Sequence, residues 1–190
     1  MQTVGILLAA GRGRRFDPTG VADKLLQVLP AGEQVLAASA RHLLAVLPRV
    51  VAVVGPADRG VAAALRALGC EVTVCPDADT GMGASLAHAV AASLPGAQAW
   101  LIALGDMPFV APATIQALGD AIAAGAQIAA PLCDGKRGNP VGFGSVHLPA
   151  LLALTGDEGA RRIVRGSAVT DVPVDDPGIF RDIDTAGDLR

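Results

Sequence analysis

Short runs rich in Val, Ile and Leu alternate along this chain with longer Ala- and Leu-rich segments of helical spacing. Parallel strands joined by covering helices produce this alternation, so it predicts an α/β fold with a mostly parallel central sheet. The short runs are too apolar to face water on one side, so we expect central strands. The predicted strands are residues 4–8, 50–54, 72–75, 100–104 and 128–131. The predicted helices are residues 34–47, 59–68, 84–93, 112–124, 147–154 and 157–164.

Composition narrows the class of protein. A chain of 190 residues with 52% hydrophobic residues suits one domain, 1–190. A formal net charge of −3 creates no field that would hold a nucleic acid. Three cysteines form no CxxC pair, and neither an export signal nor a membrane span is visible. We therefore expect a cytoplasmic protein whose cysteines are small buried hydrophobic residues.

The stretch LLAAGRGRRF, residues 7–16, concentrates positive charge where the first predicted strand ends. It carries Arg12, Arg14 and Arg15, although the chain has only 15 Lys and Arg in total. Ligands of open parallel sheets bind beyond the carboxyl ends of the strands. Glycines let the backbone approach a ligand there, and the arginines with Lys24 supply positive charge for phosphate oxygens. The loop from Gly11 to Lys24 therefore predicts a site for a small polyphosphate.

Three familiar sites do not fit the sequence. Phe16 stands where a dinucleotide-binding fingerprint needs its third small residue. The only Gly-Lys pair, Gly135-Lys136, is followed by Arg137 rather than by the Ser or Thr of a P-loop. The string GASLA, residues 83–87, lacks the closing glycine of a nucleophile elbow, and no two histidines have metal-ligand spacing. These observations disfavour a Rossmann dehydrogenase, a P-loop NTPase and a hydrolase.

The first loop resembles the signature of the nucleotidyltransferase superfamily that includes sugar-nucleotide pyrophosphorylases and MobA-like transferases. The resemblance implies a three-layer, Rossmann-like nucleotidyltransferase fold. It also implies that the glycine loop, Arg15 and Lys24 wrap the triphosphate of an incoming NTP. The matching residues, with the neighbouring loop residues that we expect to assist, are Leu8, Ala9, Ala10, Gly11, Arg12, Gly13, Arg14, Arg15 and Lys24.

Two acidic motifs resemble the metal site of the same superfamily. Asp106 follows an apolar strand in the string GDMP, which is similar to the Asp-x-Pro motif that holds Mg²⁺ beside the α-phosphate. Magnesium takes hard oxygen ligands, usually one or two carboxylates together with phosphates and waters. The closing RDIDTAGDL resembles the family's Asp-x-Asp-Thr-Pro motif, with Ala186 where Pro is common. Asp182 and Asp184 would point to the same side of an extended segment, and we favour Asp184 as the second ligand.

Two further segments resemble molybdenum cofactor cytidylyltransferases, which join CMP from CTP to molybdopterin. In the string GMGASL the resemblance places Gly81, Met82, Gly83 and Ser85 against the nucleobase, although an ordinary helix start remains an alternative. In GKRGNP we expect Lys136, Arg137, Gly138, Asn139 and Pro140 to bind the acceptor, although a solvated surface hairpin remains open. In LTGDEGARRIV, Asp157 could cap the following helix.

The order of these motifs, from Leu8 to Leu189, predicts a Mg²⁺-dependent nucleotidyltransferase. Lys24, Arg15 and Asp106 are the expected catalytic residues, and CTP and molybdopterin the expected substrates, with a molybdenum hydroxylase as a transient partner. An ionised acceptor phosphate needs no general base, so the sequence requires no catalytic His or Ser. Four alternatives stay open: use of GTP, a sugar or isoprenoid phosphate acceptor, a nucleotide-sensing module without turnover, and a chaperone for the cofactor.

Overall fold

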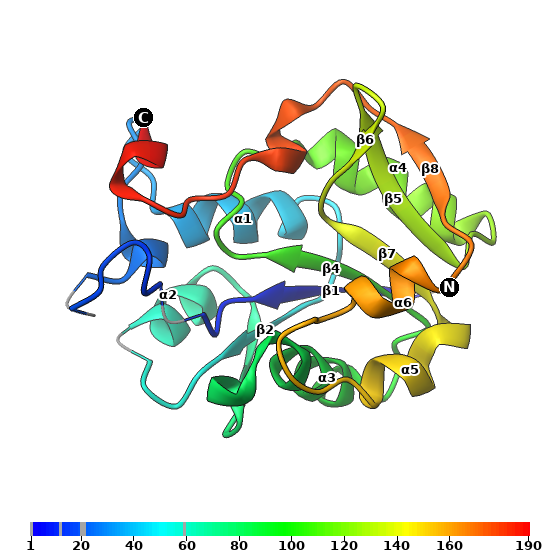
Figure 1. Ribbon diagram of the computed structural model, residues 1–190, viewed down its shortest axis with the longest axis horizontal. Helices are drawn as coiled ribbons and strands as arrows, with labels where there is room; N and C mark the ends of the chain where they lie inside the picture. The colour runs from blue at the N-terminus through cyan, green and yellow to red at the C-terminus, as the bar shows by residue number, and fades with distance from the viewer. Residues whose placement is uncertain (1, 12, 20–21, 59) are drawn as a thin grey trace.

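A computed structural model describes residues 2–11, 13–19, 22–58 and 60–190. Within that part of the chain, an eight-stranded sheet has the order β3-β2-β1-β4-β7-β5-β6, and β8 pairs with β5 (Figure 1). The strands are β1 Thr3–Leu8, β2 Val50–Val54, β3 Glu71–Val74, β4 Ala99–Leu104, β5 Ile128–Cys133, β6 Lys136–Arg137, β7 Val141–Gly144 and β8 Thr170–Pro173. The α-helices are α1 Val35–Leu44, α2 Val61–Ala67, α3 Met82–Ser93, α4 Pro112–Ala123, α5 Leu148–Leu152 and α6 Arg161–Arg165. The short 3₁₀ helices are η1 Lys24–Leu26, η2 Ala78–Thr80, η3 Ser145–His147, η4 Pro177–Phe180 and η5 Ala186–Leu189.

The sheet lies between two layers of helices, as the sequence predicts. Successive residues of a strand face opposite sides, so Leu7 packs with α1, α2 and α4, whereas Ile6 packs with α3 and α5. Four strand pairings are parallel, β1 with β2, β1 with β4, β2 with β3 and β5 with β8, and three are antiparallel. The expectation of a mostly parallel α/β sheet is confirmed.

The register of the central strands brings the ends of distant segments together. Leu8 at the end of β1 is level with Val53 in β2 and with Leu104 in β4. The chain therefore leaves β1, β2 and β4 at the same edge of the sheet. The loops that follow these strands carry the predicted phosphate-binding and acidic residues.

Three details of the predicted elements are wrong. Strand β3 is an edge strand rather than a central one, and Glu71 and Val74 at its ends are exposed. No strand is predicted after residue 131, yet β6 and β7 follow there, and β7 lies antiparallel between β4 and β5. The helix predicted at 157–164 shrinks to α6, because Gly156 and Gly159 adopt positive φ angles of 66° and 54°.

The three cysteines are free and buried, as expected. Burial raises the pKa of the Cys70 thiol to about 11, so it is protonated at neutral pH. No helix in the described ranges is long and apolar enough to cross a membrane.

Candidate active site

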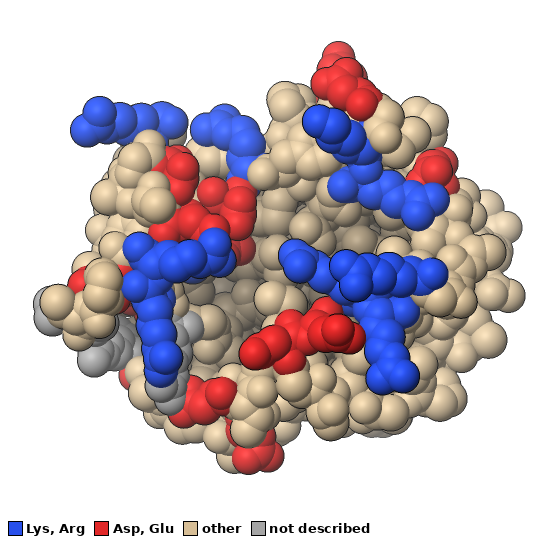
Figure 2. Space-filling view, viewed as in Figure 1, with Lys and Arg blue, Asp and Glu red and all other residues tan. Residues whose placement is uncertain are grey.

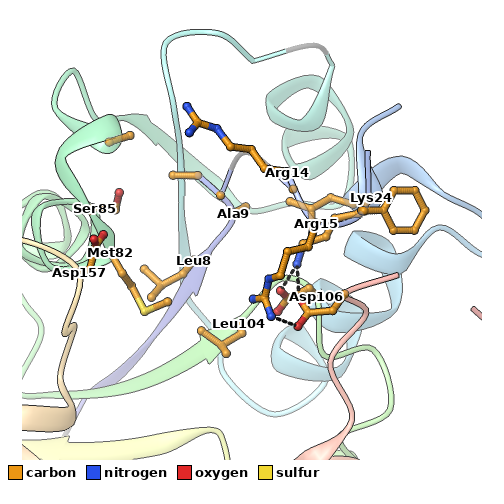
Figure 3. Close-up of a pocket in the computed structure, with 18 of the residues that line it drawn as sticks. Leu8, Ala9, Arg14, Arg15, Lys24, Met82, Ser85, Leu104, Asp106 and Asp157 are labelled. Carbon is orange, nitrogen blue, oxygen red and sulfur yellow. Dashed lines mark hydrogen bonds and ion pairs between the residues drawn. The ribbon is translucent and has the colours of Figure 1, made fainter. Parts of the chain in front are cut away.

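A cavity of about 530 Å³ opens beyond the carboxyl ends of β1 and β4 (Figure 3). Its walls include most of the predicted nucleotide-binding residues, namely Leu8, Ala9, Ala10, Gly11, Gly13, Arg14, Arg15, Lys24, Gly81, Met82, Ser85 and Asp106. Arg12 lies outside the described residues. Figure 2 shows that this face is hollowed near its centre, with basic side chains over the loop after β1 and over α6.

Two cations and two carboxylates from three distant parts of the sequence meet at one end of the cavity. The Nζ of Lys24 lies 2.6 Å from Oδ2 of Asp106 and 3.4 Å from Oδ1 of Asp184. The Nη1 of Arg15 lies 2.5 Å from Oδ2 of Asp184. The Lys24 side chain is only 11% exposed, so its charge is held close to the two carboxylates. The four side chains therefore form one compact, charge-balanced polar centre.

Local structure fixes Lys24 and Asp106 in this centre. Asp23 caps η1 by accepting a hydrogen bond from the Leu25 N–H at 2.9 Å, and the buried Leu25 side chain anchors the turn. After β4, the Gly105 N–H donates to the carbonyl of Leu8 at 2.9 Å. The turn that carries Asp106 is therefore attached to the end of β1, directly before the basic loop begins.

Asp184 is held by the final segment of the chain. The Ile183 N–H donates to the carbonyl of Asp106 at 2.8 Å, and the Ile183 side chain is buried. Oδ2 of Asp188 accepts hydrogen bonds from Thr185 Oγ1 and N–H and from the Asp184 N–H, and these bonds lower the pKa of Asp188. The structure thus brings the predicted metal ligands Asp106 and Asp184 to one place.

Asp182 lies near the same centre but does not line the cavity. Partial desolvation raises the pKa of Asp182, and the carboxylates of Asp184 and Asp106 raise it further. A backbone hydrogen bond and the ammonium of Lys24 act in the opposite direction. Asp182 therefore belongs to the electrostatic surroundings of the site.

The glycines at the start of α3 have a role that the sequence did not reveal. A Cβ atom placed on Gly81, whose φ is 137°, would lie 2.3 Å from the carbonyl oxygen of Gly156. The Gly83 N–H donates to that oxygen at 2.7 Å, and a Cβ on Gly83 would lie 2.6 Å from the carbonyl oxygen of Thr155. These glycines allow the loop before α6 to pack on α3. Gly83 is buried against this loop and does not line the cavity.

The same packing places Asp157 at the cavity wall, where Figure 3 shows it beside Met82 and Ser85. The possible role of Asp157 as the cap of the next helix is wrong, because α6 begins after Ala160. Asp79 after β3 also lines the cavity. Sequence reasoning missed both as site residues, although each precedes or follows a glycine-rich turn.

The five predicted acceptor-binding residues do not line this cavity. Arg137 on β6 pairs with Asp171, and this pair raises the pKa of Arg137 and lowers that of Asp171. Lys136 is exposed. The Asn139 N–H donates to the carbonyl of Ile179 at 3.1 Å, and a Cβ on Gly138 would collide with Ile179. Pro140 borders a small separate void. Gly138 and Asn139 thus pack against the final segment at Ile179, directly before β7.

We expect Gly83→Ala to lower the free energy of unfolding by about 1–3 kcal/mol, because its new methyl group meets the backbone of Thr155 and Gly156. Gly119→Ala is the matched control, since its Cβ would meet nothing within 4 Å and α4 gains helix propensity. That control should be neutral or more stable by up to about 1 kcal/mol. Urea denaturation measures both, and equal stability of Gly83→Ala and the wild type would contradict the packing role.

Comparisons with known proteins identify the fold family. The sequence matches the MobA-like NTP transferase domain over residues 5–172, a range that includes Lys24 and Asp106 and ends before Asp182 and Asp184. It is 30% identical over 197 residues to the purine catabolism protein PucB of Bacillus subtilis, covering 96% of this chain and 91% of PucB.

Solved structures agree with this match. Rv0371c from Mycobacterium tuberculosis superposes with a TM-score of 0.84 at 30% identity, covering 100% of this chain and 96% of that one. A nucleotidyl transferase from Methanothermobacter thermautotroptrophicus superposes with a TM-score of 0.81 at 26% identity, covering 98% of this chain and 94% of that one. The chain therefore belongs to the MobA-like NTP transferase family and has the nucleotidyltransferase fold.

Proposed function

We propose that this enzyme transfers CMP from CTP to the phosphate of molybdopterin, forming molybdopterin cytosine dinucleotide and releasing pyrophosphate. The observation that carries nucleotidyl transfer is the meeting of Lys24 and Arg15 with Asp106 and Asp184. The choice of CTP and molybdopterin is supported by the order of motifs along the chain, which resembles molybdenum cofactor cytidylyltransferases. Transient contact with a molybdenum hydroxylase, which would receive the product, is part of the same proposal.

The chemistry needs positioning and charge neutralisation more than proton transfer. An oxygen of the acceptor phosphate forms a bond to the α-phosphorus of CTP, and the bond from the α-phosphorus to the bridging oxygen breaks. The electron pair leaves with pyrophosphate. Arg14, Arg15 and Lys24 line the cavity and supply cations for the triphosphate.

The carboxylates of Asp106 and Asp184 fit a divalent metal, and we propose Mg²⁺. Oxygens of both residues converge on one cationic group, the ammonium of Lys24, so the pair already accommodates positive charge between them. Two carboxylates with phosphate oxygens are a usual donor set for Mg²⁺. When bound, the metal would neutralise charge on the phosphates. A structure of Rv0371C from Mycobacterium tuberculosis, with a TM-score of 0.80 and 30% identity to this chain, contains manganese.

The decisive experiment supplies the full chain with Mg²⁺, molybdopterin and each NTP separately. Pyrophosphate release is measured, and the product is identified by mass spectrometry. We expect a cytosine dinucleotide with CTP and little product with the other nucleotides. A guanine dinucleotide instead would reject CTP as the donor, and nucleotide binding without pyrophosphate release would favour a sensing module.

A further inference from the structure

Arg181 is a basic residue of the final segment that the predicted site does not include. Its Cζ lies 3.8 Å from the centre of the Phe109 ring, which is the geometry of a cation–π contact. The residue is exposed, and no carboxylate in the described ranges forms an ion pair with it. Because this exposed guanidinium has no carboxylate partner among those residues, its N–H groups can bind a planar, bidentate anion.

The backbone on both sides of Arg181 is anchored to the loop that carries Asp106. The Arg181 N–H donates to the carbonyl of Gly178 at 3.1 Å, and a Cβ on Gly178 would lie 2.0 Å from the carbonyl oxygen of Phe109. Two residues after Arg181, the Ile183 N–H donates to the carbonyl of Asp106 at 2.8 Å. Arg181 therefore lies across the 106–109 loop with little freedom to move away.

This cation is separate from those that line the nucleotide cavity. Among the described residues, the basic residues of the cavity wall are Arg14, Arg15 and Lys24, all from the segment after β1. Arg181 does not line this cavity and belongs instead to the final segment, two residues before Ile183, whose N–H donates to the carbonyl of Asp106. An in-line displacement requires the attacking phosphate and the departing pyrophosphate on different sides of the α-phosphorus. A cation that lies outside the wall holding Arg14, Arg15 and Lys24, on a segment hydrogen-bonded to the Asp106 backbone, fits that requirement.

We propose that Arg181, supported by the ring of Phe109, binds the phosphate of the acceptor substrate. The inference rests on the proposed nucleotidyl transfer and assigns the acceptor as a phosphomonoester. Arg181 also differs from the predicted acceptor residue Arg137, which is already paired with Asp171. Arg181 is then a binding residue for the nucleophile, whereas the β1 loop binds the leaving group.

The test compares Arg181→Met, Arg181→Lys and the control Arg66→Met. Methionine keeps a flexible apolar contact with Phe109 while removing the charge, and lysine keeps the charge but lacks the planar guanidinium with its paired N–H donors. Arg66 is exposed in the last turn of α2. With Mg²⁺, CTP and molybdopterin, we expect Arg181→Met to raise the acceptor KM about 10- to 100-fold, with a smaller rise for lysine. The Kd for CTP, measured by calorimetry, should stay within about twofold in all three variants.

A second measurement does not depend on the identity of the acceptor. Inorganic phosphate is titrated onto CTP-loaded protein, and its binding is followed by ³¹P line broadening. Binding should weaken in Arg181→Met and persist in Arg66→Met. Unchanged phosphate binding, an unchanged acceptor KM or an equal loss of CTP affinity would each overturn the role of Arg181. Phosphate binding that depends on Arg181, with no transfer to molybdopterin, would reject molybdopterin and keep the phosphomonoester site.

Discussion

Asp106→Ala is expected to lower pyrophosphate release at least about a thousandfold, because it removes a charged oxygen from the centre where the α-phosphate must react. Oδ2 of Asp106 lies 2.6 Å from Nζ of Lys24. Without it, the confined ammonium retains only the more distant Asp184 oxygen at 3.4 Å. The variant therefore loses both a proposed metal ligand and the partner that positions Lys24.

The matched control is Asp120→Ala, which removes an exposed carboxylate on α4 that accepts a hydrogen bond from Gln116. We expect this control to keep wild-type turnover, and we expect Asp106→Ala to keep most of the unfolding free energy, losing no more than about 2 kcal/mol. Stopped assays of pyrophosphate and urea denaturation measure the two quantities. A well-folded Asp106→Ala protein with near-normal turnover would remove Asp106 from the mechanism.

The strands of the central sheet and the residues at their carboxyl ends could be predicted because their signals are local. An unbroken apolar run such as β1 is buried on both faces, and the residue types just after it, Gly11 and Arg15, indicate what the sheet edge offers to a ligand. Asp106 follows β4 by the same logic. Parallel pairing of β1 with β4 then brings these loops together without any further information.

Other parts could not be predicted because their causes are long-range. Strand β7, VGFG, has two glycines and few apolar residues, and it becomes a strand because it pairs with both β4 and β5. Gly81 and Gly83 suggest a ligand, yet their lack of side chains is needed by the loop at Gly156. The contact of Arg181 with Phe109 joins residues more than seventy positions apart, so no periodicity signals it.

The buried Asp176, which does not line the cavity, also anchors the final segment. Its Oδ2 accepts hydrogen bonds from the Ala111 N–H at 2.9 Å and from Thr114 Oγ1 at 2.6 Å, at the start of α4. Its Oδ1 accepts from the Gly178 N–H at 2.9 Å. One carboxylate thus joins η4 to the start of α4, directly before the segment that carries Arg181 and Asp184.

Asp176→Ala should lower the free energy of unfolding by about 3 kcal/mol, because three donors lose a charged acceptor in a site that is only 7% exposed. The exposed neighbour Asp175→Ala is the control and should change stability by less than about 0.5 kcal/mol. Under conditions in which the variant remains folded, Asp176→Ala should also raise the acceptor KM more than the Kd for CTP. The substitution removes the anchor of the segment that carries Arg181. The cations that line the nucleotide cavity belong to another segment and keep their positions. Denaturation curves and steady-state kinetics test both effects. A variant as stable as Asp175→Ala would show that η4 does not depend on this carboxylate, and a selective loss of CTP affinity would show that the final segment serves the nucleotide instead.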